Sequence, residues 1–203
     1  MPTIELPDIQ TRDSLIADRR RRGLDTHDEV WDGSYVVMPN PDMDHQRLAT
    51  RLSGVFPTLV DDAGLGETFA GANVTSDPRD WTQNYRVPDV LVFLRDNPAA
   101  RGGIFAAGGP DLCVEIVSPR DRSREKLDFY ASVGTREVVV LDRDPWQVEV
   151  YRLDGEELVI DGVCKPGDPP VATSAVPLSW QLVPDEPRPS LALTADGERV
   201  WRL

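Results

Sequence analysis

The chain has 203 residues, of which 40% are hydrophobic, and its formal net charge at pH 7 is −13. Strong affinity for nucleic acid arises largely from Lys and Arg side chains that contact phosphates, so this charge argues against a strong general DNA-binding protein. No apolar run approaches membrane-spanning length, no signal peptide is visible, and two cysteines are too few for a disulfide framework or a zinc site, so we expect a cytoplasmic protein that does not enter a membrane.

Two regions are expected along the chain. Residues 1–28 are polar and basic, and we interpret the run Arg19–Arg22 as the solvated end of a helix that begins near Ser14; a phosphate-binding arm is the alternative. Residues 29–203 are expected to form a single domain. At its start, the sequence EVWDGSYVVM alternates around Asp32-Gly33, which predicts a β-hairpin.

The next segments predict one helix and three strands. Leu48, Leu52 and other apolar residues recur at helical spacing, which predicts an amphipathic helix over 45–64, kinked or restarted at Pro57. The three strands are expected at residues 68–76, 85–94 and 112–118. The glycine-rich segment 99–109 is expected to be a loop between the last two of these strands.

The second half of the chain predicts a helix followed by a buried strand. The helix is expected over 120–134, with Gly134 as its terminator. The run EVVVLD at 137–142 is continuously apolar, and 147–153 should pair with it as a hairpin. Two or three weak strands end the chain. The fold class is therefore α/β or mixed α+β, a mixed sheet with helices packed on it.

Two carboxylates lie in strands that should be buried. In LCVEIVS, Glu115 and Val117 share one face, and both faces of the strand are apolar. Asp89 likewise shares a face with Leu91 in the preceding strand. Burying an unpaired carboxylate costs on the order of several kcal/mol. Two such groups on neighbouring strands would also repel each other, so a cation should lie between them.

Lys126 is the basic side chain best placed to supply that charge. It lies 11 positions after Glu115, on the helix that returns over the sheet. The two acids can hold Mg²⁺ or Mn²⁺ through their oxygen atoms, while the lysine orients a water. The alternative is a buried ion pair of Lys126 with Glu115 or Asp89 that has no chemistry. The second acid favours the metal site, because an ion pair needs only one carboxylate.

The segments VPDVLVF, DLCVEIVSP, REKLDFYASVGTREVVVLD and VEVYRL occur in this order, after the upstream EVWDGSYVVMPNP and DHQRLATRL. This arrangement resembles the Uma-two family, a branch of the PD-(D/E)XK nuclease superfamily, over roughly residues 28–185. The resemblance implies a restriction-endonuclease-like core of the order αβββαβ, a central mixed sheet flanked by helices, with an extra N-terminal hairpin and extra C-terminal strands. It also implies metal-dependent hydrolysis of phosphodiester bonds.

The resemblance also assigns residues by position. Asp89 is the aspartate of the Pro-Asp element, Glu115 is the acid of the second element, and the backbone carbonyl of Ile116 is a further metal ligand. The superfamily's lysine normally stands two residues after the acid, where this chain has Val117. The Uma-two branch is similar in having its lysine on the following helix, so Lys126 is the candidate replacement.

Three further residues are accessory candidates. We interpret His45 as a polar residue at a helix N-terminus, the alternative being a contact to phosphate or help in proton transfer. Glu29 is expected to be an exposed carboxylate at a strand end, the alternative being a supplementary acid near the metal. Tyr130 follows Lys126 by one helical turn, so its ring should pack and its hydroxyl should hydrogen-bond near the site.

The leading hypothesis is a metal-dependent endonuclease that binds Mg²⁺, with Mn²⁺ as a substitute, and acts on nucleic acid, most of all DNA. The alternative is a catalytically weak or inactive nuclease-fold protein with a binding or regulatory role, which the net charge and Val117 favour. A weaker option is a metal-dependent hydrolase that acts on something other than long duplex DNA. Cutting both strands of a duplex needs two sites, so a homodimer is expected by fold-level analogy.

Overall fold

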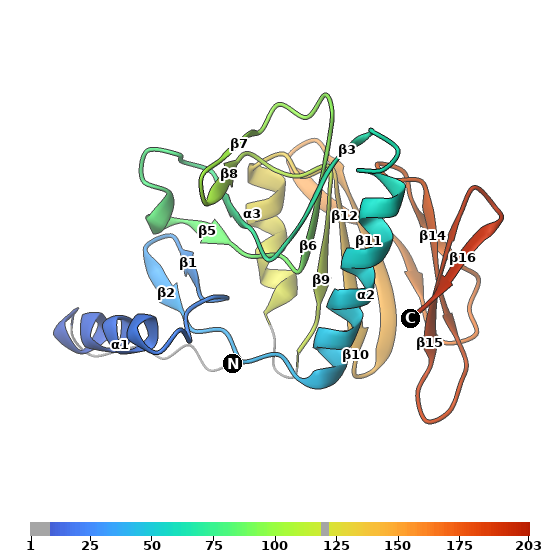
Figure 1. Ribbon diagram of the computed structural model, residues 1–203, viewed down its shortest axis with the longest axis horizontal. Coiled ribbons are helices and arrows are strands. Elements are labelled where there is room, and N and C mark those ends of the chain that lie inside the picture. The colour runs from blue at the N-terminus through green and yellow to red at the C-terminus, as the bar shows by residue number, and fades with distance from the viewer. Residues whose placement is uncertain (1–8, 119–121) are drawn as a thin grey trace.

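A six-stranded mixed sheet forms the centre of the computed structural model, which describes residues 9–118 and 122–203 (Figure 1). Its strand order is β12-β11-β10-β9-β6-β3. The pair β9 and β10 is parallel and all other neighbouring pairs are antiparallel, which confirms a mixed sheet. The strands are β3 (Gly66–Ala70), β6 (Val90–Leu94), β9 (Leu112–Ile116), β10 (Glu137–Arg143), β11 (Trp146–Asp154) and β12 (Glu157–Cys164).

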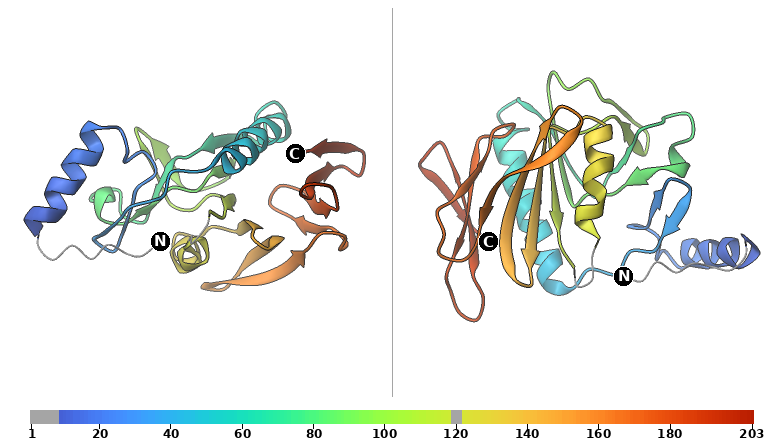
Figure 2. Two further views of the ribbon diagram at one scale, coloured as in Figure 1. Left: turned by 90° about the horizontal axis from the view of Figure 1, so that it is seen from below. Right: turned by 180° about the vertical axis from the view of Figure 1, so that it is seen from behind.

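Two helices cover opposite faces of this sheet (Figure 2). Helix α2 (Met43–Leu59) packs Leu48, Leu52 and Phe56 against the sheet face that carries Val114. Helix α3 (Leu127–Ser132), which follows a 3₁₀ turn η2 (Ser123–Lys126), packs Phe129 and Tyr130 against the face that carries Cys113. Successive residues of a buried strand point to opposite faces, so β9 contributes to both cores.

Two smaller sheets and helix α1 (Ile9–Arg21) flank this centre. The C-terminal sheet packs Trp180, Leu182, Leu191 and Leu193 into the core on the α2 side. The N-terminal sheet has the order β2-β1-β5-β4-β8-β7, and a short 3₁₀ turn η1 (Trp81–Gln83) precedes β5. Its strands are β1 (Glu29–Trp31), β2 (Ser34–Val36), β4 (Asn73–Thr75), β5 (Tyr85–Arg86), β7 (Ala100–Gly102) and β8 (Phe105–Ala107). The C-terminal strands are β13 (Val171–Thr173), β14 (Leu178–Val183), β15 (Ser190–Ala195) and β16 (Arg199–Arg202).

Several sequence predictions are confirmed. The hairpin at Asp32-Gly33 forms between β1 and β2, and both turn residues have positive φ (47° and 81°), which an Asp-Gly pair tolerates. The buried strand at 137–142 and its hairpin partner are β10 and β11. The order αβββαβ is that of α2, β3, β6, β9, α3 and β10. Within the described residues, no helix is both long and apolar enough to cross a membrane.

Other boundaries were wrong. The strand expected at 68–76 is two strands, β3 and β4, which turn apart at Gly71 (φ 61°) and join different sheets. The strand expected at 85–94 is interrupted at 87–89, because Pro88 lacks the backbone N–H that a ladder needs. The expected loop at 99–109 contains the hairpin of β7 and β8.

Both predicted core helices are shorter than expected. Helix α2 begins at Met43 and ends at Leu59, several residues before the expected end at Gly64, and Pro57 lies within its last turn. The second helix begins as the 3₁₀ turn η2 and ends at Ser132, while residues 120 and 121 of the predicted segment lie outside the described part. N-terminal helix α1 begins at Ile9, before the expected Ser14.

The start of α2 is fixed by Asp42. The Asp42 carboxylate accepts a hydrogen bond from the backbone N–H of His45 at 2.8 Å, which is the geometry of an N-cap. The same carboxylate accepts two hydrogen bonds from the Arg143 guanidinium, at 2.7 and 3.2 Å. The hydrogen bonds from Arg143 and His45 lower the pKa of Asp42 to about 2. Asp42 therefore joins the N-terminus of α2 to the end of β10.

Replacing Asp42 by Ala should lower the free energy of unfolding by about 1 kcal/mol at pH 7, because an N-cap acceptor is lost. The pKa of this acid is depressed in the folded state, so its contribution should be present above the unfolded value of about 3.9 and disappear as the pH falls toward 2. Urea unfolding of both proteins between pH 2.5 and 7 measures the difference. Asn caps helices as well as Asp, so Asp42→Asn should retain most of the stability at pH 7; an equal loss in both variants would contradict capping.

Candidate active site

The pairing of β6 with β9 brings Asp89 next to the end of β9. Val90 pairs with Val114 and Leu91 with Cys113, and Asp89 directly precedes the first paired residue of β6. The Asp89 N–H donates to the Val114 carbonyl at 3.1 Å, which keeps Asp89 beside β9. The two predicted acids therefore lie at the same end of these strands, where both line one cavity.

Asp89 is also held by the backbone of β9. Its Oδ2 accepts a hydrogen bond from the Ile116 N–H at 2.7 Å, and its side chain is 20% exposed. The next residue, Val117, donates its N–H to the Leu141 carbonyl, and its side chain is half-buried in the core on the α3 side. The position at which the superfamily carries lysine is therefore occupied by a packing residue.

Lys126 contacts the buried acid, as the sequence predicted. Its Nζ lies 3.1 and 3.0 Å from the two carboxylate oxygens of Glu115, and Lys126 is only 1% exposed. The last turn of η2 brings this side chain back to the end of β9. The Tyr130 hydroxyl, one turn later on α3, donates to Oε1 of the same carboxylate from a fully buried position. Glu115 therefore has a cation and a neutral donor on its carboxylate.

The expectation for Glu29 was wrong, since this residue is fully buried. Its Oε1 lies 2.9 Å from Lys126 Nζ and also accepts the Val87 N–H, while Oε2 accepts the Trp31 indole N–H at 2.6 Å. Glu29 is the first residue of β1, which belongs to the N-terminal sheet. This sheet brings Glu29 to the end of the central sheet, where Lys126 lies. A third carboxylate is thus present, and Lys126 lies between Glu115 and Glu29.

His45 lies near the N-terminus of α2, as predicted, and its side chain is also turned into the site. Its Nε2 lies 2.8 Å from Asp89 Oδ1, and its Nδ1 lies 3.2 Å from the Ser118 hydroxyl. A carboxylate can only accept, so Nε2 carries the hydrogen, and in the neutral ring Nδ1 accepts from Ser118. His45 occupies the first turn of α2, so the Asp42 cap also sets the position of this imidazole.

Burial controls the protonation of the central acid. Desolvation raises the pKa of Glu115 to about 8, an effect that the Lys126 charge opposes and the charges of Asp89 and Glu29 reinforce. Burial likewise raises the pKa of Tyr130 well above its ordinary value, so its hydroxyl keeps its proton and remains a donor. Glu29, Asp89 and Glu115 therefore disfavour one another's charged forms, and Lys126 offsets only part of this repulsion.

A second buried cation, Arg86, was not identified from the sequence. Its guanidinium lies 4.6 Å from the Trp31 ring centroid and 4.3 Å from that of Phe129, and it donates to the Val30 carbonyl. Burial lowers the pKa of Arg86, and the charges of Glu29 and Glu115 oppose that shift. The sequence around Arg86 does not predict this burial, because its aromatic neighbours Trp31 and Phe129 lie far away in the chain, on β1 and α3.

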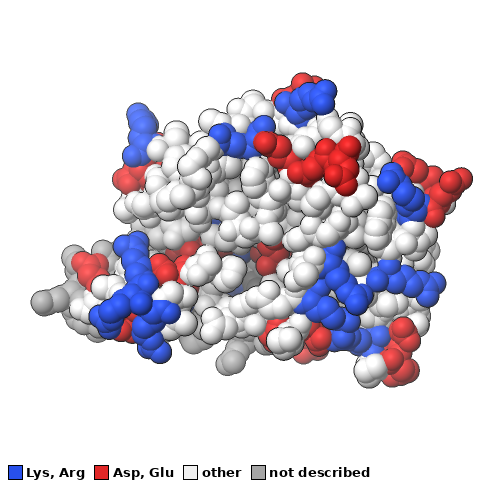
Figure 3. Space-filling view, viewed as in Figure 1, with Lys and Arg blue, Asp and Glu red and all other residues white. Residues whose placement is uncertain are grey.

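Some of the residues described above line one cavity of ≈ 350 Å³ between α2 and the ends of the central strands. Figure 3 shows a hollow near the centre of this face, with acidic atoms visible inside it. His27, for which the sequence gave no signal, and the small residues of α2 lie around its walls. The polar and charged side chains described above that line this cavity are those of His45, Asp89, Glu115, Ser118 and Lys126.

The donor set fits a hard divalent cation that keeps several waters. Asp89 and Glu115 supply carboxylate oxygens, and the backbone of Ile116 lies in the same cavity wall. In the described part of the chain, no three His, Cys, Asp or Glu side chains are grouped as a ready-made metal cage. Hard divalent cations such as Mg²⁺ are commonly bound by one or two carboxylates plus water and substrate phosphate.

Comparison with known proteins agrees with this fold. The family model described as "Uma2: Putative restriction endonuclease" matches residues 18–186. Among solved structures, the chain is similar to a protein from Anabaena variabilis ATCC 29413 described as "a putative nuclease belonging to DUF820". The two share 22% sequence identity over 73% of this chain and 82% of the other, with a TM-score of 0.60, so the likeness concerns the fold. No curated protein matches the chain.

Replacing Lys126 by Met should lower the free energy of unfolding by about 3–5 kcal/mol, because Glu115 and Glu29 would remain buried without their cation. Adding Glu115→Gln to Lys126→Met should recover part of this loss. Urea unfolding of the wild type, both single variants and the double variant gives the coupling energy.

Arg124→Met is a matched control for this cycle. Arg124 also pairs with two carboxylates, Asp142 and Glu149, but its side chain is 40% exposed, so a much smaller loss is expected. Additive losses in the Lys126 and Glu115 variants would show that the two groups do not stabilise each other.

Proposed function

Because the chain belongs to the Uma2 family, whose description is that of a restriction endonuclease, we propose that it is a metal-dependent nuclease. Asp89, Glu115 and the carbonyl of Ile116 would hold Mg²⁺, with Mn²⁺ as a substitute. The observation that carries this proposal is the pairing of β6 with β9, which brings Asp89 and Glu115 together in the wall of one cavity. The contact of Lys126 with Glu115 completes the acid and lysine set.

Each protein group has a defined task in phosphodiester hydrolysis. A bound divalent cation would supply Lewis-acid activation of a water and would offset negative charge on the phosphate. Lys126 lies in a water-poor wall of the cavity, where its ammonium group would orient the attacking water or stabilise the charge that develops on the phosphorane. Tyr130 holds the Glu115 carboxylate in one orientation through a hydroxyl that stays protonated.

Glu29 and His45 support these groups as positioning residues. Glu29 fixes Lys126 from the side opposite Glu115, and its remaining oxygen is held by the Trp31 indole. His45 holds Asp89 Oδ1 while Ile116 holds Oδ2, so both oxygens of this carboxylate are oriented. Such supporting hydrogen bonds fix the direction of a ligand's lone pairs.

The substrate of this activity would be nucleic acid, and we propose DNA. A homodimer stays a prediction that rests on the need for two sites to cut a duplex.

The second candidate function is a nuclease-fold protein that does not cut. It is supported by the full occupation of the Glu115 carboxylate by Lys126 and Tyr130, which a metal ion would have to share or displace.

Glu115→Gln and Asp89→Asn should each reduce metal-dependent cleavage at least about a hundredfold, because each removes a charged oxygen ligand. The measurement is the loss of supercoiled plasmid and of labelled single-stranded oligonucleotide, with Mg²⁺, with Mn²⁺ and with EDTA. Glu67→Gln is the matched control, since this carboxylate lies on neighbouring β3, is 58% exposed and lies outside the cavity. Cleavage by Glu115→Gln at the wild-type rate would refute the proposal.

Calorimetric titration with Mn²⁺ separates the two candidate functions. The nuclease proposal requires binding at micromolar to millimolar metal, which Glu115→Gln and Asp89→Asn should abolish. Wild-type protein that binds no metal in this range would favour the binding or regulatory protein.

His45→Ala should weaken Mn²⁺ binding about 10- to 100-fold without abolishing it, because Asp89 would lose one of the hydrogen bonds that orient it. His45→Asn, which retains a shorter donor, should be less affected. The control Gln46→Ala changes a neighbouring residue of the cavity wall that makes no such contact among the described hydrogen bonds. An unchanged Mn²⁺ affinity in His45→Ala would remove this role.

A further inference from the structure

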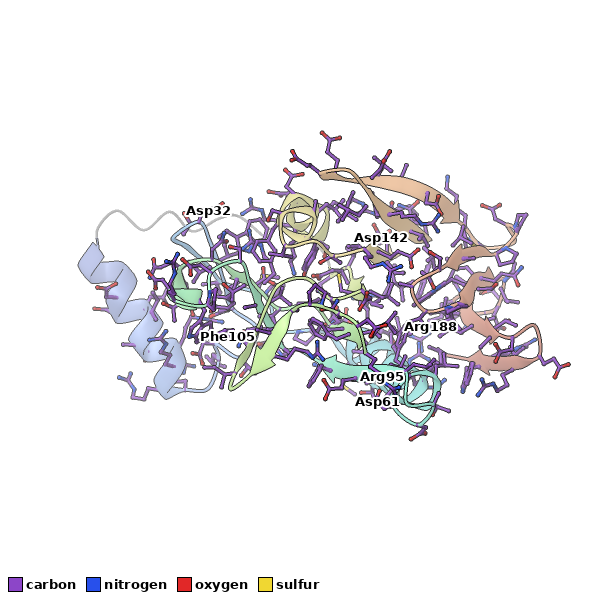
Figure 4. The ribbon with its side chains drawn as sticks, turned by 90° about the horizontal axis from the view of Figure 1, so that it is seen from above. Asp32, Asp61, Arg95, Phe105, Asp142 and Arg188 are labelled. Atoms are coloured by element: carbon purple, nitrogen blue, oxygen red, sulfur yellow. The ribbon has the colours of Figure 1, made fainter. Side chains whose placement is uncertain are left out.

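Three arginines gather between α2 and the C-terminal sheet, and a fourth, Arg202, lies beside them on β16. Arg51 donates to the backbone carbonyl of Arg202 at 3.3 Å, and Arg188 is paired with Asp44 in the first turn of α2. Figure 4 shows Arg188 beside the C-terminal sheet, on the side toward the central sheet. These residues are called the α2 arginine cluster: Arg47, Arg51, Arg188 and Arg202.

The cluster carries more positive charge than its neighbours neutralise. In the described part of the molecule, Asp44 is the one carboxylate paired with it, in contact with Arg188 and 4.0 Å from Arg47 Nε. That Nε atom is buried and has no hydrogen-bond partner. Burial and the charges of Arg188 and Arg51 lower the pKa of Arg47, against the opposing effect of Asp44. The guanidinium groups of Arg47, Arg51 and Arg188 therefore share one acid, although the whole chain has a net charge of −13.

The basic run at the end of α1 is different. Arg19 pairs with Asp28, Arg20 with Asp25, and both Arg21 and Arg22 with Asp18. Each of these guanidinium groups thus has a carboxylate on or near its own helix, which supports the interpretation of this run as a solvated helix end. The α2 arginine cluster, in contrast, has only Asp44 as a paired acid among the described residues.

The cluster and the candidate active site lie on two flanks of the same helix. Gln46, Ala49 and Thr50 line the catalytic cavity, while Arg47 and Arg51 follow on the next flank of α2. Figure 3 shows basic side chains gathered on this face beside the hollow that contains the acidic atoms. A helix with its side chains is about 10–12 Å wide. This width corresponds to roughly three nucleotide steps of about 3.4 Å each.

We propose that the α2 arginine cluster is the phosphate-binding surface that holds a nucleic-acid strand beside the catalytic cavity. The inference rests on the proposed function, because the strand it holds is the substrate of that site. Arginine forms paired hydrogen bonds with phosphate oxygens, and a strand that leaves the cavity over α2 would meet the cluster within a few nucleotides. The surface would concentrate a polyanion at this one place on a molecule that is elsewhere acidic.

The test measures how tightly the protein binds nucleic acid in the absence of cleavage. Fluorescence anisotropy of a labelled 20-nucleotide single strand and of the matching duplex is measured in EDTA, over a series of KCl concentrations. Arg51 and Arg202 are exposed, so Arg51→Ala/Arg202→Ala should fold normally. The double variant should bind the preferred probe at least about fivefold more weakly at 0.1 M salt, and its log-log salt slope should be smaller by about 1.4–1.8.

Arg21→Ala/Arg22→Ala is the matched control, because these side chains are equally exposed but already paired with Asp18. Its affinity should stay within about twofold of the wild type. An unchanged affinity and slope in Arg51→Ala/Arg202→Ala, an equal loss in the α1 control, or no binding of either probe by the wild type would overturn the proposal.

Cleavage assays on the same proteins separate this inference from the proposed function. Wild-type cleavage with an unchanged KM in Arg51→Ala/Arg202→Ala would overturn the surface and leave the nuclease proposal standing. Wild-type protein that binds through Arg51 and Arg202 but does not cut would support the surface and overturn the nuclease proposal.

Discussion

The carboxylate of Glu115 lies in a strand whose five residues are all buried, and compensating its charge determines much of the surrounding structure. An unpaired buried carboxylate costs on the order of several kcal/mol, so the chain must bring a cation to it. Lys126 meets this requirement from η2, and Glu29 in turn holds Lys126 from the other side. The N-terminal sheet, the central sheet and the segment before α3 are thus joined through one ion-pair group.

Sequence reasoning found the part of this site that follows from local patterns. Alternation placed Glu115 on a buried face, and helical spacing turned Lys126 toward the end of β9, as the structure shows. Glu29 was missed because its burial depends on where β1 lies relative to the central sheet, which a three-residue strand does not reveal. Strand periodicity also failed at residues 87–89, where Pro88 ends the ladder and Asp89 comes to lie at a strand start.

The position of His45 shows why a residue at a helix start is hard to interpret from sequence. The residue that caps this helix is Asp42, but a cap fixes only where a helix begins. The direction of the imidazole is set by the Asp89 carboxylate, which is 44 residues away in the chain. Because Arg143 on β10 also holds Asp42, the start of α2 is fixed relative to the central sheet, and His45 is fixed with it. Local capping thereby becomes a constraint on the geometry of the site.

The charges around the cavity give the site and the arginine cluster complementary roles. The carboxyl groups of Glu29, Asp89 and Glu115 lie close to the buried cations Lys126 and Arg86, and burial raises the pKa of Glu115, so added negative charge is unfavourable in this group. A phosphodiester would add such charge, and its approach is favourable only when a further cation offsets it. Across α2, the balance is reversed, with three arginines, Arg47, Arg51 and Arg188, for one carboxylate. A strand can therefore be held by its phosphates on one flank of the helix, while the reaction on the other flank depends on the ion that Asp89 and Glu115 would bind.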